Sequence, residues 1–111
     1  MQTRMLTIDD RGKTIRLHVG ERVCIELDQI AGTGYKWTQP ALDSDAVSLE
    51  SDEYVPPAPA TRPVAGNSGL RRFVFAAHAV GVVTIQTVPQ TSWDGTEDER
   101  SRFVASIVVE L

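Results

Sequence analysis

The feature of this sequence that most constrains its fold is a period of two in its apolar residues. Apolar side chains occupy every second position in 15–19 and 23–27, and again in 103–111. Residues two apart in a strand share one face of a sheet, so each of these segments offers one apolar face. No segment sustains the three- and four-residue spacing of an amphipathic helix, and we therefore expect essentially no helix.

Turn-forming residues divide the sequence into eight expected strands. Asp9-Asp10-Arg11-Gly12 is expected to close an opening hairpin, and Gly20-Glu21 is expected to form a short corner. The proline-rich segment 56–63 lacks the amide donors of a strand, so we expect it to be a loop. The strands are expected near 4–8, 13–19, 22–28, 34–39, 46–54, 70–77, 81–89 and 100–110.

Apolar sheet faces with no helices to cover them must pack against each other. The sequence therefore predicts an all-β fold, an antiparallel β-sandwich of about seven to eight strands. Its 111 residues are enough for one domain, which we expect to span 1–111.

Alternate connections between antiparallel strands emerge at the same end of a sandwich. By this parity, the loops at 29–33, 55–69 and 90–99 should share one end. Loops held by a rigid scaffold are where binding residues concentrate. The arrangement favours a binding module.

Composition and charge exclude several classes of function. Eleven basic and fifteen acidic residues give a net charge of −4, which argues against nucleic-acid binding. Cys24, the single cysteine, cannot form an internal disulfide or a multi-cysteine metal site, and no base lies near it in sequence. We therefore expect no enzyme activity, no metal and no cofactor.

The sequence also bears on the location of the protein. No segment approaches the ~18–20 apolar residues of a membrane span, so we expect no membrane association. The first residues lack the apolar core of a signal peptide. We expect a cytoplasmic protein, or a periplasmic or secreted one if a leader was removed.

The first of the three loops carries a resemblance to a known family. Residues 27–37 resemble the Asn-Pro-Thr-Thr-Gly-Tyr-x-Trp signature of the chagasin-type inhibitors of cysteine peptidases. Ile30-Ala31-Gly32 replaces the Asn-Pro-Thr of that signature. The matching residues are Thr33, Gly34, Tyr35 and Trp37.

The other two loops extend this resemblance to about residues 15–110. Gly66-Asn67-Ser68-Gly69 resembles the second motif of the family, Gly-x-Gly-Gly, with Ser68 in place of a glycine. Thr91-Ser92-Trp93 stands where the family has Arg-Pro-Trp and keeps only the tryptophan. The three partial motifs occur in the order and at the spacing of the family.

The resemblance implies an immunoglobulin-like sandwich that reversibly blocks papain-like cysteine peptidases. The three loops would occlude the active-site cleft, with Thr33 nearest the thiol of the peptidase and Trp93 as an aromatic anchor. The protein is expected to be a monomer with a cathepsin-type peptidase as its partner. The implied peptidase-binding residues are Ala31, Gly32, Thr33, Gly34, Gly66, Asn67, Ser68, Gly69, Thr91, Ser92 and Trp93.

Alternatives stand beside this hypothesis. A non-inhibitory interaction module of the same ancestry, which binds another protein or peptide, would account for the missing arginine and the altered first loop. Tyr35 and Trp37 fit packing at the core or its edge better than contact with a partner. The acidic segment 94–99 fits a solvated hairpin loop that would favour basic cleft rims. Arg71-Arg72 could balance that acidic loop or face water.

Overall fold

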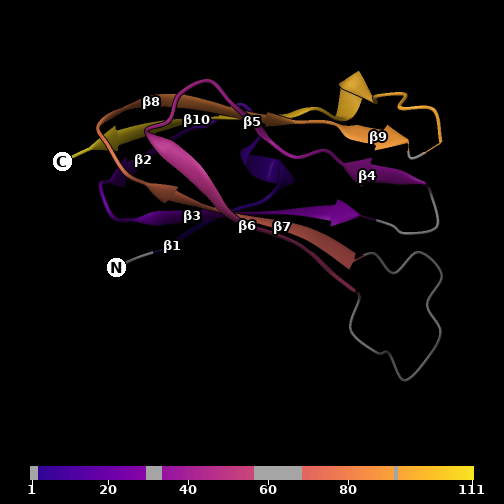
Figure 1. Cartoon of the computed structure of the whole chain (residues 1–111), viewed down its shortest axis with the longest axis horizontal. Helices are drawn as coiled ribbons and strands as arrows, with labels where there is room; N and C mark the ends of the chain where they lie inside the picture. The colour runs from indigo at the N-terminus through magenta and orange to yellow at the C-terminus, as the bar shows by residue number, and fades with distance from the viewer. Residues whose placement is uncertain (1–2, 30–33, 57–68, 92) are drawn as a thin grey trace.

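The structure, a computed structural model, describes residues 3–29, 34–56, 69–91 and 93–111. Strands dominate these ranges (Figure 1). They are β1 (Thr3–Leu6), β2 (Thr14–His18), β3 (Arg22–Gln29), β4 (Tyr35–Trp37), β5 (Ala41–Leu42), β6 (Val47–Val55), β7 (Gly69–Ala77), β8 (Gly81–Thr87), β9 (Pro89–Thr91) and β10 (Phe103–Glu110).

The strands form two main sheets that face each other. One sheet has the order β1-β3-β7-β6, and the other has the order β2-β10-β8-β5. In Figure 1, β8 and β10 lie in the upper layer, and β3 and β7 lie in the lower one. Strands β4 and β9 pair with each other, and a single residue, Val88, separates β8 from β9, so this pair extends the upper layer.

The core lies between the two sheets and consists of the alternating apolar residues. Phe73 and Phe75 come from β7, and their rings are 6.5 Å apart between centroids. They meet inward residues of β8 and β10, such as Ile85 and Ile107, and all four side chains are fully buried. Burying such side chains contributes about 1.5–3 kcal/mol each to stability, which makes this layer contact the main source of stability.

The sandwich predicted from the sequence is confirmed, and each of the eight expected strands is present. The expected strand at 81–89 is divided at Val88 into β8 and β9, and β5 is an additional two-residue strand. In the described residues the helical segments are two three-residue 3-10 turns, η1 (Ile8–Asp10) and η3 (Glu99–Ser101). None of the described helices combines the length and apolar character needed to cross a membrane.

The expected opening hairpin is wrong, because β1 and β2 belong to different sheets. Strand β1 runs parallel to β3, and β2 runs parallel to β10, so two edge pairs of the sandwich are parallel. The η1 turn carries the chain between the layers: the Thr7 hydroxyl accepts a bond from the Asp9 amide, and the Asp10 carboxylate accepts one from the Thr7 amide. Gly12, with φ of +82°, completes the crossing.

Cys24 lies on β3 but outside the core cluster, as its alternation with Val23 and Ile25 predicts. Its side chain is nevertheless buried. Burial raises the pKa of the Cys24 thiol, with a smaller contribution from the nearby Glu26 carboxylate. A buried thiol with a raised pKa is a poor nucleophile.

The layer contact generates a test of the fold. Ile107→Ala should lower the free energy of unfolding by about 2–5 kcal/mol, because it leaves a cavity at a fully buried position between the sheets. Val82→Ala, at a side chain 63% exposed on the paired strand β8, should change it by less than about 0.5 kcal/mol. Urea unfolding measures both, and equal losses would contradict the assignment of the core.

Candidate functional site

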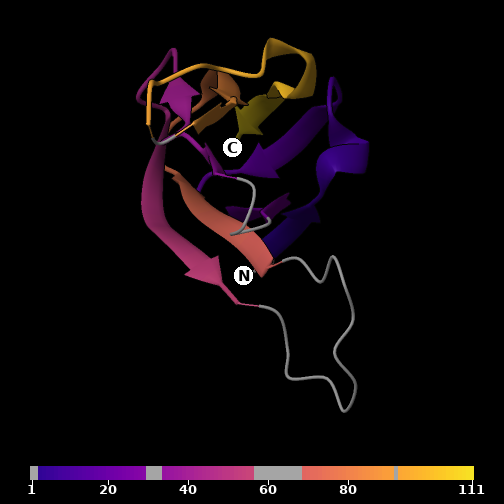
Figure 2. The same ribbon diagram turned by 90° about the vertical axis from the view of Figure 1, so that its right-hand side faces the viewer.

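The three connections singled out by the parity argument leave the sandwich at one end. Gln29, the last residue of β3, is paired with Gly69, the first residue of β7. Tyr35 at the start of β4 is paired with Thr91 at the end of β9. These strand ends lie on the right of Figure 1, and Figure 2 looks onto them. We call this end the tip and define it by Gly34, Gly69 and Trp93.

At the tip, the indole of Trp93 rests directly on the backbone of Gly34. A Cβ added to Gly34 would lie 2.1 Å from Cζ3 and 2.7 Å from Cη2 of Trp93, so any larger residue here would displace the indole. Gly34 also has φ of +79°, a conformation that glycine adopts without strain. The Trp93 side chain remains 69% exposed. The ring is therefore held by one tip segment while most of its surface faces solvent.

The second tip glycine is covered by an aromatic ring in the same way. A Cβ on Gly69 would lie 2.4 Å from the hydroxyl of Tyr54 and 2.5 Å from the carbonyl oxygen of Val55. Tyr54 comes from the end of β6, so this contact joins the two strands that flank residues 56–68. Tyr54 could not be identified from the sequence, because alternation alone does not show which ring covers which glycine.

Thr91 organises the turn that presents Trp93. Its side chain is only 4% exposed, and its hydroxyl donates a hydrogen bond to the Asp94 carboxylate. The Thr96 amide donates to both the Thr91 hydroxyl and Asp94, each at 3.0 Å. The Gly95 amide, at φ of +73°, donates to the Thr91 carbonyl oxygen at 3.1 Å. Threonine at this position therefore supports the turn, where the family motif places an arginine.

The hydrogen bonds of this turn also set the charge of Asp94. Donation from the Thr91 hydroxyl, and then from Thr96, lowers the pKa of the Asp94 carboxyl below its ordinary value. The turn is therefore tightest when Asp94 is ionised. Asp94 was expected in a solvated hairpin loop, and the sequence gave no sign of this carboxylate–hydroxyl pair.

Trp37 joins the strands beneath the tip. The indole N–H donates to the carbonyl oxygen of Asp28 at 2.9 Å, and its backbone N–H donates to the side-chain oxygen of Gln29 at 2.9 Å. Trp37 is 8% exposed and belongs to the core cluster, which confirms its predicted packing role. Tyr35, two residues earlier, is instead at the surface. The packing prediction was thus correct for Trp37 and wrong for Tyr35.

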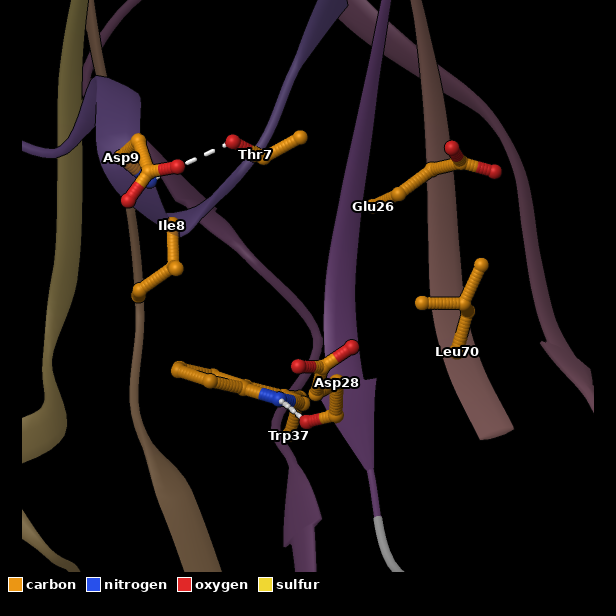
Figure 3. Close-up of a pocket in the computed structure, with 7 residues that line it drawn as sticks. All are labelled: Thr7, Ile8, Asp9, Glu26, Asp28, Trp37 and Leu70. Carbon is orange, nitrogen blue, oxygen red and sulfur yellow. Dashed lines mark hydrogen bonds between the residues drawn. The ribbon is translucent and has the colours of Figure 1, made fainter. Parts of the chain in front are cut away.

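Two hollows flank Trp37 on the side of the sandwich. Figure 3 shows the larger, of about 380 Å³, with the indole of Trp37 hydrogen-bonded to Asp28 and with Ile8 and Leu70 on its walls. The smaller, of about 280 Å³, lies between Tyr35 and residues 98–101. Among the described residues, neither hollow is lined by Gly34, Gly69 or Trp93.

The charged segments near the tip are largely paired. In the acidic segment 94–99, Asp98 accepts a bond from the Ser101 hydroxyl at 2.8 Å and Glu99 pairs with Arg102. The expectation that Arg71-Arg72 balances the acidic segment is wrong, whereas Arg72 does lie on the outer face, with 35% of its side chain exposed. Arg72 pairs with Glu26 and Glu53 across neighbouring strands, and Arg71 pairs with Asp52. Cross-strand partners cannot be read from sequence without the register.

The structure places four of the eleven residues implied by the resemblance. Gly34 and Trp93 are in contact, Gly69 lies at the same end, and Thr91 supports the turn from a buried position. The remaining seven lie outside the described residues. They are Ala31, Gly32, Thr33, Gly66, Asn67, Ser68 and Ser92.

A β-sandwich with three segments gathered at one end is a scaffold for loop-mediated binding. The model of the "Chagasin family peptidase inhibitor I42" matches residues 16–107. The chain therefore belongs to the chagasin family of peptidase inhibitors. This assignment supports an inhibitor over a non-inhibitory interaction module and over an enzyme.

Solved structures agree with this fold. The cysteine protease inhibitor EhICP2 from Entamoeba histolytica has a TM-score of 0.81 at 24% identity, with 97% of this chain and 96% of that chain covered. Amebosin gives 0.73 at 25% identity, covering 99% and 100%. PbICP-C, solved in complex with falcipain-2, gives 0.59 at 23% identity, covering 98% and 90%. No curated protein sequence matches the chain.

The seating of Trp93 on Gly34 is tested with two glycine variants. Gly34→Ala and Gly12→Ala both place a side chain at positive φ, which should cost about 1–2 kcal/mol of stability in each. A Cβ on Gly12 meets no atom within 4 Å, so only Gly34→Ala should displace a neighbouring ring. The indole N–H resonance of Trp93 should shift in Gly34→Ala alone. A shift of equal size in Gly12→Ala would contradict the contact.

The Asp94 turn generates a pH prediction. Because the folded-state pKa of Asp94 is lowered, its stabilising effect should be complete above about pH 4, the ordinary Asp range, and should be lost as pH falls through the lower folded value. The protection of the Thr96 amide against exchange, relative to its intrinsic rate at each pH, should therefore fall at acid pH. Asp94→Asn keeps an acceptor oxygen and should remove this pH dependence. An unchanged acid response in Asp94→Asn would assign the effect to another group.

Proposed function

We propose that this protein is a reversible inhibitor of papain-like cysteine peptidases that blocks the active-site cleft with its tip. The contact between Trp93 and Gly34 is the observation that carries the proposal, because it unites the first and third tip segments in one binding unit. Membership of a family of peptidase inhibitors supports the same mode of action. The protein performs no chemistry of its own in this proposal.

The first segment is proposed to occupy the centre of the cleft. The nucleophile of such a peptidase is a thiolate activated by a histidine. Thr33 would approach that thiolate with its backbone, since the preceding Gly32 offers no Cβ to obstruct the approach. Strands β3 and β4 flank the segment and are joined to each other through Trp37.

Trp93 is proposed to be the main anchor. A tryptophan at the centre of an interface is frequently worth 2 kcal/mol or more. Its ring is already seated on Gly34, so it enters the groove of the peptidase without first having to become ordered. Thr91 and Asp94 hold the turn from below, and Ser92 completes the third segment.

The second segment, Gly66-Asn67-Ser68-Gly69, is proposed to brace the opposite lip of the cleft. Gly69 is fixed by Tyr54 and by its pairing with Gln29, so the base of this brace has a defined position. Together with Ala31 and the residues above, these positions form the proposed peptidase-binding surface. Carboxylates of the 94–99 segment would favour approach to basic cleft rims.

Titration into papain or a cathepsin with a fluorogenic substrate tests this proposal. The wild-type protein should give stoichiometric and reversible loss of activity. Trp93→Ala should raise the inhibition constant by roughly 30-fold, the equivalent of about 2 kcal/mol, because the anchor is lost. Thr33→Asp should also weaken inhibition, since a carboxylate would face the thiolate.

Val82→Ala is the matched control, because Val82 is exposed in the sandwich near the opposite end of β8. It should leave the inhibition constant unchanged. An absence of inhibition toward several papain-like peptidases at micromolar protein would contradict the proposal. It would favour the alternative, a non-inhibitory interaction module.

A further inference from the structure

Arg71 is a charged residue on the sheet face that carries the buried phenylalanines of β7. It alternates on β7 with Phe73 and Phe75, which are fully buried in the core, whereas Arg72 points to the other face. The side chain of Arg71 is only 19% exposed. An arginine in such a position costs desolvation energy unless its donors are well occupied.

The donors of Arg71 are occupied by two neighbouring strands. Its Nε and Nη2 both donate to the carboxylate of Asp52 on β6, Nη2 at 2.8 Å. Its Nη1 donates to the backbone carbonyl of Trp37 on β4 at 2.9 Å. The guanidinium carbon also lies 5.2 Å from the centre of the Phe73 ring. One planar group thus joins β4, β6 and β7.

This contact lies where the strands that support all three tip segments meet. Through Trp37, β4 is bound to Gln29 at the end of β3 and is paired with Pro89 on β9. On the other side, Arg71 is paired with Tyr54, whose ring covers Gly69. One half of the tip, Gly34 with Trp93, is therefore connected to the other half, Gly69, through the Arg71 side chain as well as through the Trp37–Gln29 bond and the Gln29–Gly69 pair.

We propose that Arg71 is a positioning residue that fixes the spacing between these two halves of the tip and thereby sets the affinity for the peptidase. This inference rests on the proposed function. Arg71 touches no peptidase residue in this role, because it lies beneath the tip. Its planar fork holds Asp52 and the Trp37 carbonyl at once, which the single ammonium of a lysine cannot do in the same geometry.

The experiment compares Arg71→Lys and Arg71→Met with Arg72→Met. Arg72 is a matched control because it is the adjacent arginine, pairs with two carboxylates and faces away from the core. We expect both Arg71 variants to raise the inhibition constant roughly tenfold, mainly through faster dissociation, and Arg72→Met to change it less than about threefold. Arg71→Lys keeps a positive charge beside Asp52, so its inhibition constant can be measured even if Arg71→Met fails to fold.

A double-mutant cycle separates positioning from general stability. In a Trp93→Ala background one half of the tip no longer binds the peptidase. Arg71→Lys should then raise the inhibition constant by less than about threefold. Additive effects, or no effect of Arg71→Lys on the inhibition constant of a folded variant, would overturn the inference while leaving the proposed function intact.

Hydrogen exchange at the Trp37 amide gives a readout that needs no peptidase. Faster exchange in Arg71→Lys than in Arg72→Met supports the role of Arg71 in holding β4, and equal exchange overturns it. If the wild-type protein inhibits no peptidase, the proposed function fails, and this comparison still decides whether Arg71 fixes the strand ends.

Discussion

Burial of two apolar sheet faces against each other is the interaction on which the whole structure depends. It holds β3 and β7 opposite β8 and β10, and it brings their ends into register at one end of the molecule. The relative positions of these strand ends determine the geometry of the tip. Binding residues on such a scaffold need few contacts among themselves, because the strands beneath already determine where each segment begins.

Much of this arrangement could be predicted from the sequence, because both the period of two and strand parity are local properties. Alternation at 15–19, 23–27 and 103–111 gave the strands, and their order gave the common end of the three connections. The same reasoning gave a hairpin between β1 and β2 that does not exist. Alternation shows which face a residue occupies, but it does not show which strand lies beside it.

The parts of the site that escaped prediction are contacts between residues distant in sequence. The covering of Gly69 by Tyr54 and the link from Arg71 to Trp37 both depend on register and on packing between layers. Thr91 shows the limit of motif comparison as well. It stands at a position where the family has an arginine, and its short side chain instead serves the turn through Asp94.

The two aromatic-covered glycines also bear on how such an inhibitor can diverge. A larger residue at Gly34 would displace the ring of Trp93, and one at Gly69 would meet both Tyr54 and the backbone carbonyl of Val55, so a change at either glycine would disturb the tip. Adaptation to new targets is thereby directed to positions outside these pairs. Libraries that keep Gly34, Trp93, Gly69 and Tyr54 constant and randomise the neighbouring positions would explore new specificities without disrupting the packing of the tip.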